Sequence, residues 1–341
     1  MEPWRAVGAF LGLAFVAPTL AGQAAAADRV VVAVPAVAAG RVTPLLREWF
    51  GDTVAVQAVA AMGSERLAAP CVLLLWDEWT LARLAAVGAL GSMPAPEDGN
   101  AARQGGVFVL PFGCDHGIAV DTRVLAAVAA PRSWEDLALH PDLHDRLGLV
   151  GPEVDGSPWL LAMQQRLLRG DREDAGVALW TTLDARAGTL ATSYETMLAD
   201  LTGGRLAAAI GPGWVLDEAV VRASGRLRLE PLAAPRRTRL GIAVAAGSVG
   251  PHLSVARRLA GSTSVDAVAE ILGLAAADGA AAPLESDVAR RWWLRFERDV
   301  RGRGRGAERL ADLLDMLFGV LFLVCAWFLW RSLRSANPPP A

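Results

Sequence analysis

The sequence predicts an α/β fold in which a mostly parallel sheet is covered by helices on both faces. The chain has 341 residues, of which 53% are hydrophobic, and this is enough for two lobes and a large core. Short apolar runs alternate with helical stretches along its first part, the order typical of a parallel sheet. Apolar segments at both ends of the chain stand apart from this pattern.

The amino end has the features of a secretory signal peptide. Residues 1–27 contain Arg5, then an apolar stretch, then a small-residue run with an A-x-A site at Ala25 and Ala27. This pattern predicts an exported protein whose mature chain begins near Asp28. The alternative is an uncleaved anchor, because Glu2 opposes the single arginine.

The carboxyl end is predicted to anchor the chain in a membrane. No charged residue interrupts 316–330, and the apolar segment is about 18 residues long, near the lower limit for spanning hydrocarbon. Trp327 and Trp330 suit a membrane interface. We expect a tether at 301–310, a transmembrane helix at 311–331 and a tail at 332–341. The alternative is a buried core helix.

The first predicted elements alternate in type. Strands are expected at 29–34, 53–58 and 71–75, with helices at 42–50 and 80–87 and a short helix near Ser64. Ligands of parallel sheets lie beyond the carboxyl ends of the strands. In this chain those ends are the segments 35–40, 59–64 and 76–79.

The later elements begin with two apolar runs, 106–111 and 117–120, where we expect the chain to cross to a second lobe. Ser133 and Asp136 have the spacing of a capping box, and so do Thr192 and Glu195. The remaining predictions are strands at 147–150, 206–210 and 240–245, and helices at 134–140, 159–169, 175–183, 192–201, 255–260 and 265–274.

Several classes of function are excluded by composition and motifs. The net charge is -3, there is no lysine and the arginines are dispersed, so no nucleic-acid partner is predicted. The sequence lacks G-x-S-x-G, G-x-x-x-x-G-K-[ST] and H-E-x-x-H, and no enzyme activity or cofactor is predicted. Pro141 separates His140 from His144, so no metal site is expected there.

The three cysteines specify neither a zinc site nor a disulfide framework. Cys71 and Cys114 could pair in an oxidising compartment or could be two buried thiols on neighbouring strands. In the run Cys114, Asp115, His116, alternate residues of a strand share a face, so the cysteine and histidine face the same way. With no oxyanion loop evident, we interpret this run as structural.

Four segments together carry a resemblance to a known family. They are VVVAVPAVAAGRVTPLLREWF, PRSWEDLALHPDLHDRLGLVGPEVDGSPW, SYETMLADLTGGRLAAAIGPG and SVARRLAGSTSVDAVAEIL. The chain resembles the extracellular solute-binding proteins of bacterial uptake systems, the type 2 periplasmic binding proteins that include iron-, thiamine- and polyamine-binding members. The resemblance implies a two-lobed periplasmic-binding-protein-like fold that is not an enzyme, with lobe 1 at 28–112 and 240–300 and lobe 2 at 113–239.

The resemblance also places a ligand site on the loops between the lobes. The implied ligand-binding residues are Arg41, Trp76, Asp77, Glu78, Asp115, Asp155, Gly156, Ser157, Ser193, Tyr194 and Trp214. In the loop 76–79, two tryptophans could stack on a planar or cationic solute, or one could pack under a helix while the acids cap it. The helix at Pro158 could bind an anion, or Asp155 could cap it instead. Iron is disfavoured because Tyr194 is the only tyrosine.

The function predicted from the sequence is therefore solute capture. The chain is expected on the periplasmic, extracytoplasmic face of the cytoplasmic membrane, anchored by its C-terminal helix. It would bind a small solute by closure about hinges near 112–116 and 237–242, for an ABC-type uptake system with a permease partner or for sensing. The alternative is a non-binding scaffold of a membrane complex that retains the fold.

Overall fold

The structure, a computed structural model, describes most of the chain between residues 29 and 302. The described residues are 29–62, 69–95, 103–104, 106–125, 130–188, 190–232, 237–277 and 284–302, with Phe322 and Trp327. The predicted signal peptide, the short helix near Ser64 and nearly all of the predicted tether, transmembrane helix and tail lie outside them. Among the described residues, no helix has both the length and the apolar character needed to cross a membrane.

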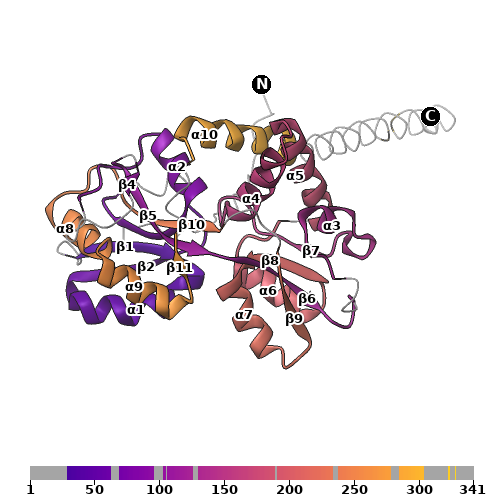
Figure 1. Cartoon of the computed structure of the whole chain (residues 1–341), viewed down its shortest axis with the longest axis horizontal. Helices are drawn as coiled ribbons and strands as arrows, with labels where there is room; N and C mark the ends of the chain where they lie inside the picture. Colours follow the sequence, from indigo (N-terminus) through magenta and orange to yellow (C-terminus); the bar gives the residue numbers. More distant parts are fainter. Residues whose placement is uncertain are drawn as a thin grey trace, which may run out of the picture.

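The first lobe is built on a seven-stranded sheet (Figure 1). Its order is β11-β5-β10-β3-β1-β2, with β4 paired to β5; β1, β2 and β3 are parallel, and β10 runs antiparallel between β3 and β5. The strands are β1 (Val30–Pro35), β2 (Val54–Val59), β3 (Val72–Asp77), β4 (Arg103–Gln104), β5 (Phe108–Cys114), β10 (Thr238–Val244) and β11 (Ala275–Ala276). The helices are α1 (Ala36–Phe50), α2 (Glu78–Ala86), α8 (Gly250–Leu259) and α9 (Ser262–Leu272).

The central strand β3 shows why this sheet is covered on both faces. Its six residues, VLLLWD, are all buried. Val72 and Leu74 pack with the apolar side chains of α1, α8 and α9, while Leu73 packs on the opposite face with those of α2. A continuous apolar run is therefore the pattern that this position requires, because alternate side chains enter two different cores.

The second lobe has a four-stranded sheet of order β7-β8-β6-β9. The strands are β6 (His116–Asp121), β7 (Leu147–Gly148), β8 (Ala208–Pro212) and β9 (Leu227–Pro231). The helices are α3 (Trp134–Leu139), α4 (Ser157–Leu168), α5 (Glu173–Ala187), α6 (Tyr194–Gly203) and α7 (Gly213–Arg222). Short 3₁₀ turns lie at Gly51–Thr53 in the first lobe and at Pro141–Leu143 in the second.

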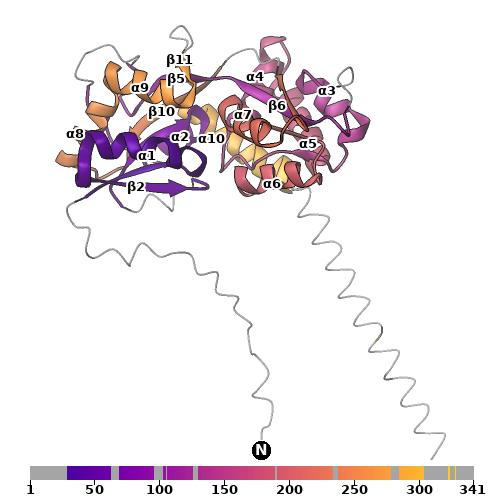
Figure 2. The same cartoon turned by 90° about the horizontal axis from the view of Figure 1, so that it is seen from below.

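The chain passes between the two sheets at two places. Strand β5 continues through Asp115 into β6, and β9 is followed by β10 on the other sheet. The first crossing lies within the hinge expected near 112–116, whereas the second lies between residues 231 and 238, just before most of the segment expected near 237–242. Figure 2 shows the lobes side by side, joined by these strands.

Local sequence signals were right at one helix start and wrong at two. The capping box of Ser133 and Asp136 is confirmed at α3, where Asp136 N–H donates to the Ser133 hydroxyl and the Asp136 carboxylate accepts in return. At α6 the prediction was one residue early, because Ser193, not Thr192, is the N-cap and accepts from Thr196 N–H. Helix α1 begins directly after Pro35 instead of after a loop to residue 40.

The segment 284–302 was not predicted to form helices, and sequence assigned it to the first lobe up to residue 300. It forms α10 (Ser286–Arg295) and a π-helical turn, η6 (Phe296–Arg301). Helix α10 packs on α2 of the first lobe, whereas η6 packs on α5 of the second. The segment therefore contacts both lobes, with α10 lying across the space between α2 and α5 (Figure 1).

Candidate functional site

A cavity lies between the two lobes at the carboxyl ends of the parallel strands. The first lobe contributes the ends of β1 and β3, and the second contributes the residues before α4, the start of α6 and the end of β8. The lining residues are Pro35, Ala36, Val37, Ala60, Leu75, Trp76, Asp77, Val154, Asp155, Ser193, Tyr194, Glu195, Pro212, Trp214 and Leu240. This is where ligands of open α/β sheets bind.

This cavity adjoins a wider hollow of about 630 Å³ between α1, α6 and α7, and the two share Ala36, Val37, Glu195 and Trp214. The cavity itself is narrow. Its volume is about 40 Å³, whereas one water molecule takes up about 30 Å³ in the liquid. Ligand pockets for small molecules are typically about 300–1,000 Å³. A solute of ordinary size therefore does not fit in the cavity alone: it would extend into the wider hollow, or the lobes would have to separate.

On the first lobe, a bulge at the end of β3 directs side chains into the cavity. Leu75 has φ of 66°, the left-handed region, and the register of β10 against β3 shifts between Gly241 and Ile242, which face Trp76 and Leu74. Strained, bulged backbone of this kind is often found beside binding sites, where it redirects a side chain. Trp76 is held in place by its indole N–H, which donates to Ala33 O at 3.1 Å.

Asp77 follows Trp76 and ends the strand. Its carboxylate accepts from Thr80 N–H at 3.0 Å and from the Thr80 hydroxyl at 2.7 Å, so it is the N-cap of α2. It also reaches the other lobe, because Gly156 N–H donates to it at 3.4 Å. Asp77 therefore belongs to both the helix start and the interlobe contact.

On the second lobe, Asp155 is the centre of a buried polar network. Its carboxylate accepts from Tyr194 OH at 2.7 Å and from Ser157 N–H at 2.9 Å. His116 Nε2 lies 3.8 Å from it, and His116 Nδ1 lies 3.2 Å from the hydroxyl of Thr238. Because His116 and Thr238 begin the crossover strands β6 and β10, this network joins the cavity to the hinge.

The two carboxylates have opposite pKa displacements. Burial and the negative charge of Asp155 raise the pKa of Asp77 to about 6. Burial alone would raise the pKa of Asp155 too, but the nearby His116 imidazole, 3.8 Å away, and the hydrogen bonds from Ser157 and Tyr194 lower it below its usual range. The site therefore holds one firmly ionised carboxylate next to one that titrates near pH 6.

Neighbouring groups remain protonated. Burial and the charge of Asp155 raise the pKa of Tyr194 well above its usual range. Burial and the same charge raise the pKa of Cys114. At the other end of β3, away from the site, burial raises the pKa of Cys71 to about 11. Both cysteines are buried free thiols, as in the second of the two alternatives, but they are not on neighbouring strands, because β10 lies between β3 and β5.

The pKa of Asp77 leads to a testable pH dependence. Its folded pKa, about 6, lies above the model-peptide value of 3.8, so its contribution to stability is fully present below about pH 4 and is lost as the pH rises through 6. We expect this to lower the free energy of unfolding by up to about 3 kcal/mol between pH 4 and 7. In Asp77→Asn, which can still cap α2, that part of the decrease should disappear. Urea denaturation of both proteins across this range is the measurement, and parallel curves would contradict the assignment.

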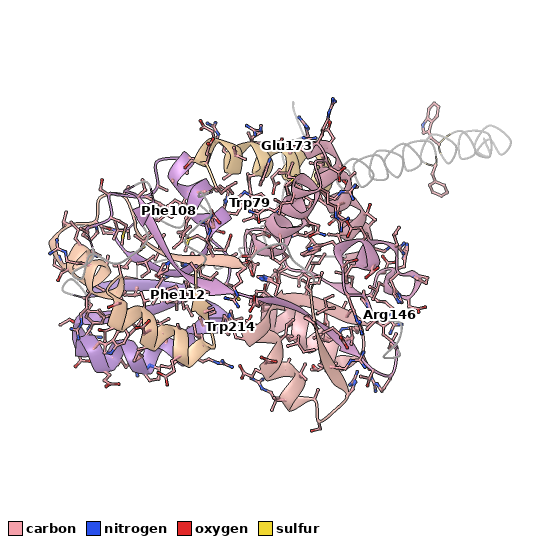
Figure 3. The ribbon with its side chains drawn as sticks, viewed as in Figure 1. Trp79, Phe108, Phe112, Arg146, Glu173 and Trp214 are labelled. Carbon is pink, nitrogen blue, oxygen red and sulfur yellow. The ribbon has the colours of Figure 1, made fainter. Side chains whose placement is uncertain are left out.

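Arg41 lies at the mouth of the cavity, not inside it. From α1 it reaches Glu218 of α7 at 3.0 Å, and its guanidinium carbon lies 5.7 Å from the centre of the Trp214 ring. Both members of the ion pair are partly exposed. The contact joins the lobes on the side of the cavity where Trp214 lies (Figure 3).

The other predicted site residues differ in whether they reach the cavity. Ser193 lines the cavity and caps α6, whereas Gly156 and Ser157 lie behind Asp155 and are absent from the lining. Asp155 accepts from Ser157 N–H, so its own carboxylate occupies the helix start where an anion was considered. Two predicted residues are not brought to the cavity: Glu78 is buried against Arg239, and Asp115 is exposed and paired with Arg237.

Sequence reasoning did not foresee how several residues around the cavity are placed. Trp79, expected as a possible stacking face, is buried against Trp180 instead, with ring centres 5.5 Å apart. The cavity is completed by apolar residues such as Pro35 and Leu240, which carry no local signal of a site. His116 was interpreted as structural, and only the fold shows that it faces Asp155. Among the described residues, no group of three or more His, Cys, Asp or Glu is placed to hold a metal ion.

Comparisons with known proteins support the fold. No protein-family model matches this sequence, and no curated protein matches it. Among solved structures, the periplasmic binding protein AfuA of Actinobacillus pleuropneumoniae, described with fructose-6-phosphate bound, is 14% identical, with a TM-score of 0.64 over 80% of this chain and 98% of that one. Iron-bound HitA of Pseudomonas aeruginosa is 19% identical, with a TM-score of 0.57 over 80% and 99%.

A third structure agrees with these two. The apo ferric ion-binding protein A of Pasteurella haemolytica is 12% identical, with a TM-score of 0.58 over 81% of this chain and 96% of that one. All three are type 2 periplasmic binding proteins. The described part of the chain therefore has the two-lobed α/β fold of that group, as the sequence resemblance implied.

Proposed function

We propose that this chain is an extracytoplasmic solute-binding protein that holds a small solute between its two lobes and is not an enzyme. The supporting observation is the cavity, because residues from the strand ends of both lobes line it and the crossover strands lie beside it. Two lobes joined by hinge strands can open to admit a solute and close around it. The site residues named from the sequence that line this cavity are the proposed ligand contacts: Trp76, Asp77, Asp155, Ser193, Tyr194 and Trp214.

The charges around the cavity favour a neutral or cationic solute. Asp77, Asp155 and Glu195 line it, and none of its described lining residues is an arginine or histidine. An anionic solute would have to approach the ionised Asp155 without a compensating positive charge in the lining. The apolar remainder, including Trp76 and Trp214, suits a solute with an apolar or planar body.

The predicted ends of the chain complete the proposal. An export signal would place the lobes on the periplasmic side, and the apolar segment 311–331 would hold them at the cytoplasmic membrane. From there the chain would deliver its solute to an ABC-type permease or report occupancy to a membrane partner. The energy for transport would come from that partner, because this chain has no G-x-x-x-x-G-K-[ST] motif.

A second candidate is a non-binding module that has kept the fold. Two observations favour it: the cavity is very small, and one hydrophobic core, which includes Leu73 of the first lobe and Leu160 of the second, runs through both lobes. A protein with fixed lobes would offer a rigid surface to other proteins instead of capturing a solute. The same experiment separates the two candidates.

A thermal-shift screen of the full chain in detergent tests the proposal. The panel contains amino acids, choline, putrescine, thiamine and fructose-6-phosphate. We expect a neutral or cationic compound to raise Tm, because a solute that binds only the folded protein stabilises it. The increase should be lost in Trp76→Ala and retained in Trp49→Ala, a partly buried tryptophan of α1 outside the cavity. If no compound raises Tm, the second candidate is favoured.

A further inference from the structure

The segment 284–302 is attached to the first lobe through its amino-terminal half. Leu284 N–H donates to the Glu78 carboxylate at 2.5 Å, and the indole N–H of Trp79 donates to Ala289 O at 3.0 Å. The guanidinium carbon of Arg83 lies 4.1 Å from the centre of the Trp293 ring. All three partners belong to α2, so α10 is fixed to that helix.

The carboxyl-terminal half is attached to the second lobe. Phe296 is fully buried, with its ring centre 4.7 Å from Trp159 and 5.7 Å from Trp180. Ion pairs surround this contact: Arg291 with Glu173 at 2.9 Å, Arg295 with Asp174 at 2.6 Å, and Arg301 with Glu153. These partners come from α4, α5 and the segment just before α4.

Direct contacts between the lobes lie at the same edge. Trp79 of the first lobe stacks on Trp180 of the second, and both are at most 1% exposed. Met62 N–H donates to Glu153 O at 2.8 Å, which joins the lobes beside Arg301. Figure 3 shows Trp79 and Glu173 on the α10 side of the crossover strands and Trp214 on the opposite side.

The two edges of the cleft are held with very different strength. At the Trp214 edge, the described ion pair is Arg41–Glu218, which is partly exposed, and such pairs contribute little. The partly buried Trp214 also packs against the first lobe there, beside Arg41. At the α10 edge, buried aromatic rings from both lobes and from the segment pack together, and aromatic burial is among the largest stabilising contributions in a core. Closure is therefore stabilised mainly at the α10 edge.

We propose that residues 284–302 are an interlobe strap that keeps the lobes closed without a solute. A helix fixed to both lobes cannot keep both sets of contacts when one lobe rotates relative to the other. The separation point is Phe296, where α10 ends and the π-helical turn begins, because irregular helical turns often mark places that move. Opening of the cleft requires Phe296 to leave Trp159 and Trp180.

Distances across the cleft mouth test this in the full chain without solute. Spin labels are placed with Gly40→Cys on α1 and Val221→Cys on α7, in a Cys325→Ser background, since the other two cysteines are buried. An added Cβ at Gly40 meets nothing within 4 Å, and Val221 is 79% exposed. Pulsed electron–electron double resonance then reports the distribution of distances between the labels on α1 and α7.

We expect one short distance in the labelled parent and in Arg298→Ala, because Arg298 pairs with Asp299 of the strap itself. Phe296→Ala should add a population at a longer distance between α1 and α7, at least about tenfold larger than in the parent, because a buried aromatic side chain is lost. If that variant fails to fold, Arg295→Ala/Arg301→Ala tests the same attachment with smaller loss of core.

Two results would overturn the strap: a parent that already shows the long distance, or released variants that keep only the short one. Neither result depends on solute capture, because no solute is added. A chain that binds nothing can be strapped, and a chain that binds a solute can lack a working strap.

Discussion

Glu78→Ala should lower the free energy of unfolding by about 3–5 kcal/mol, the cost typical of breaking a buried ion pair by removing one partner. The Glu78 and Arg239 side chains are 3% and 8% exposed, and Arg239 Nε donates to the Glu78 carboxylate at 3.0 Å. The same carboxylate accepts from Leu284 N–H. Its removal would leave a guanidinium buried beside the first crossover without its carboxylate.

Chemical denaturation of three variants measures this effect. Asp115→Ala is the matched control, because it breaks the exposed Asp115–Arg237 pair near the same crossover and should cost less than about 1 kcal/mol. Glu78→Ala/Arg239→Met should recover much of the loss, because the buried positive charge is then removed together with its carboxylate. If Glu78→Ala costs no more than Asp115→Ala, the buried pair does not contribute as described.

Trp180→Ala should destabilise the protein by about 3–5 kcal/mol, as large-to-small changes of buried tryptophan do. Trp180 is fully buried, contacts the rings of Trp79 and Phe296, and donates its indole N–H to Trp159 O at 2.7 Å. Since those rings belong to the first lobe and the strap, the loss should also weaken the coupling between the lobes.

Two probes of unfolding separate these effects. In the parent, unfolding followed by circular dichroism, which reports both lobes, and by a probe confined to the first lobe should give the same single transition, as expected of a cooperative unit. In Trp180→Ala the two transitions should separate, whereas Trp180→Phe should lose less stability and keep them together. A single coincident transition in Trp180→Ala would show that the lobes are coupled by contacts elsewhere.

The fold could be predicted from the sequence where local pattern and tertiary environment agree. The apolar runs that became β1, β2 and β3 were predicted within about two residues. In β1 and β3 the reason is that strands buried on both faces are apolar throughout, whereas β2 is a partly exposed edge strand that keeps a mostly apolar sequence. The strap was missed because nearly half of its residues are charged and its two attachment surfaces are far away in the sequence. Strand β9 and helix α7 were missed as well, although α7 buries Val215, Leu216 and Ala219 on one face.

The position of the cavity could be predicted from the sequence, but only some of the residues that line it. Strand ends identify the edge of a sheet where a cavity forms, and that rule placed Trp76, Asp77 and Asp155 at the cavity. It could not separate Asp77 from its neighbour Glu78, because the partner that removes Glu78 from the site, Arg239, is 161 residues away. Likewise, nothing local in Leu75 shows that it is bulged.

The most direct test of solute capture between the lobes is a binding measurement on a chain whose cleft has been bridged. In the Gly40→Cys/Val221→Cys chain, a bismaleimide linker joins α1 to α7 across the mouth, and calorimetry follows the compound that raises Tm most. We expect the bridged chain to lose binding. Each chain that carries only one of the two added cysteines, treated in the same way, should retain it. Unchanged affinity in the bridged chain would contradict capture between the lobes.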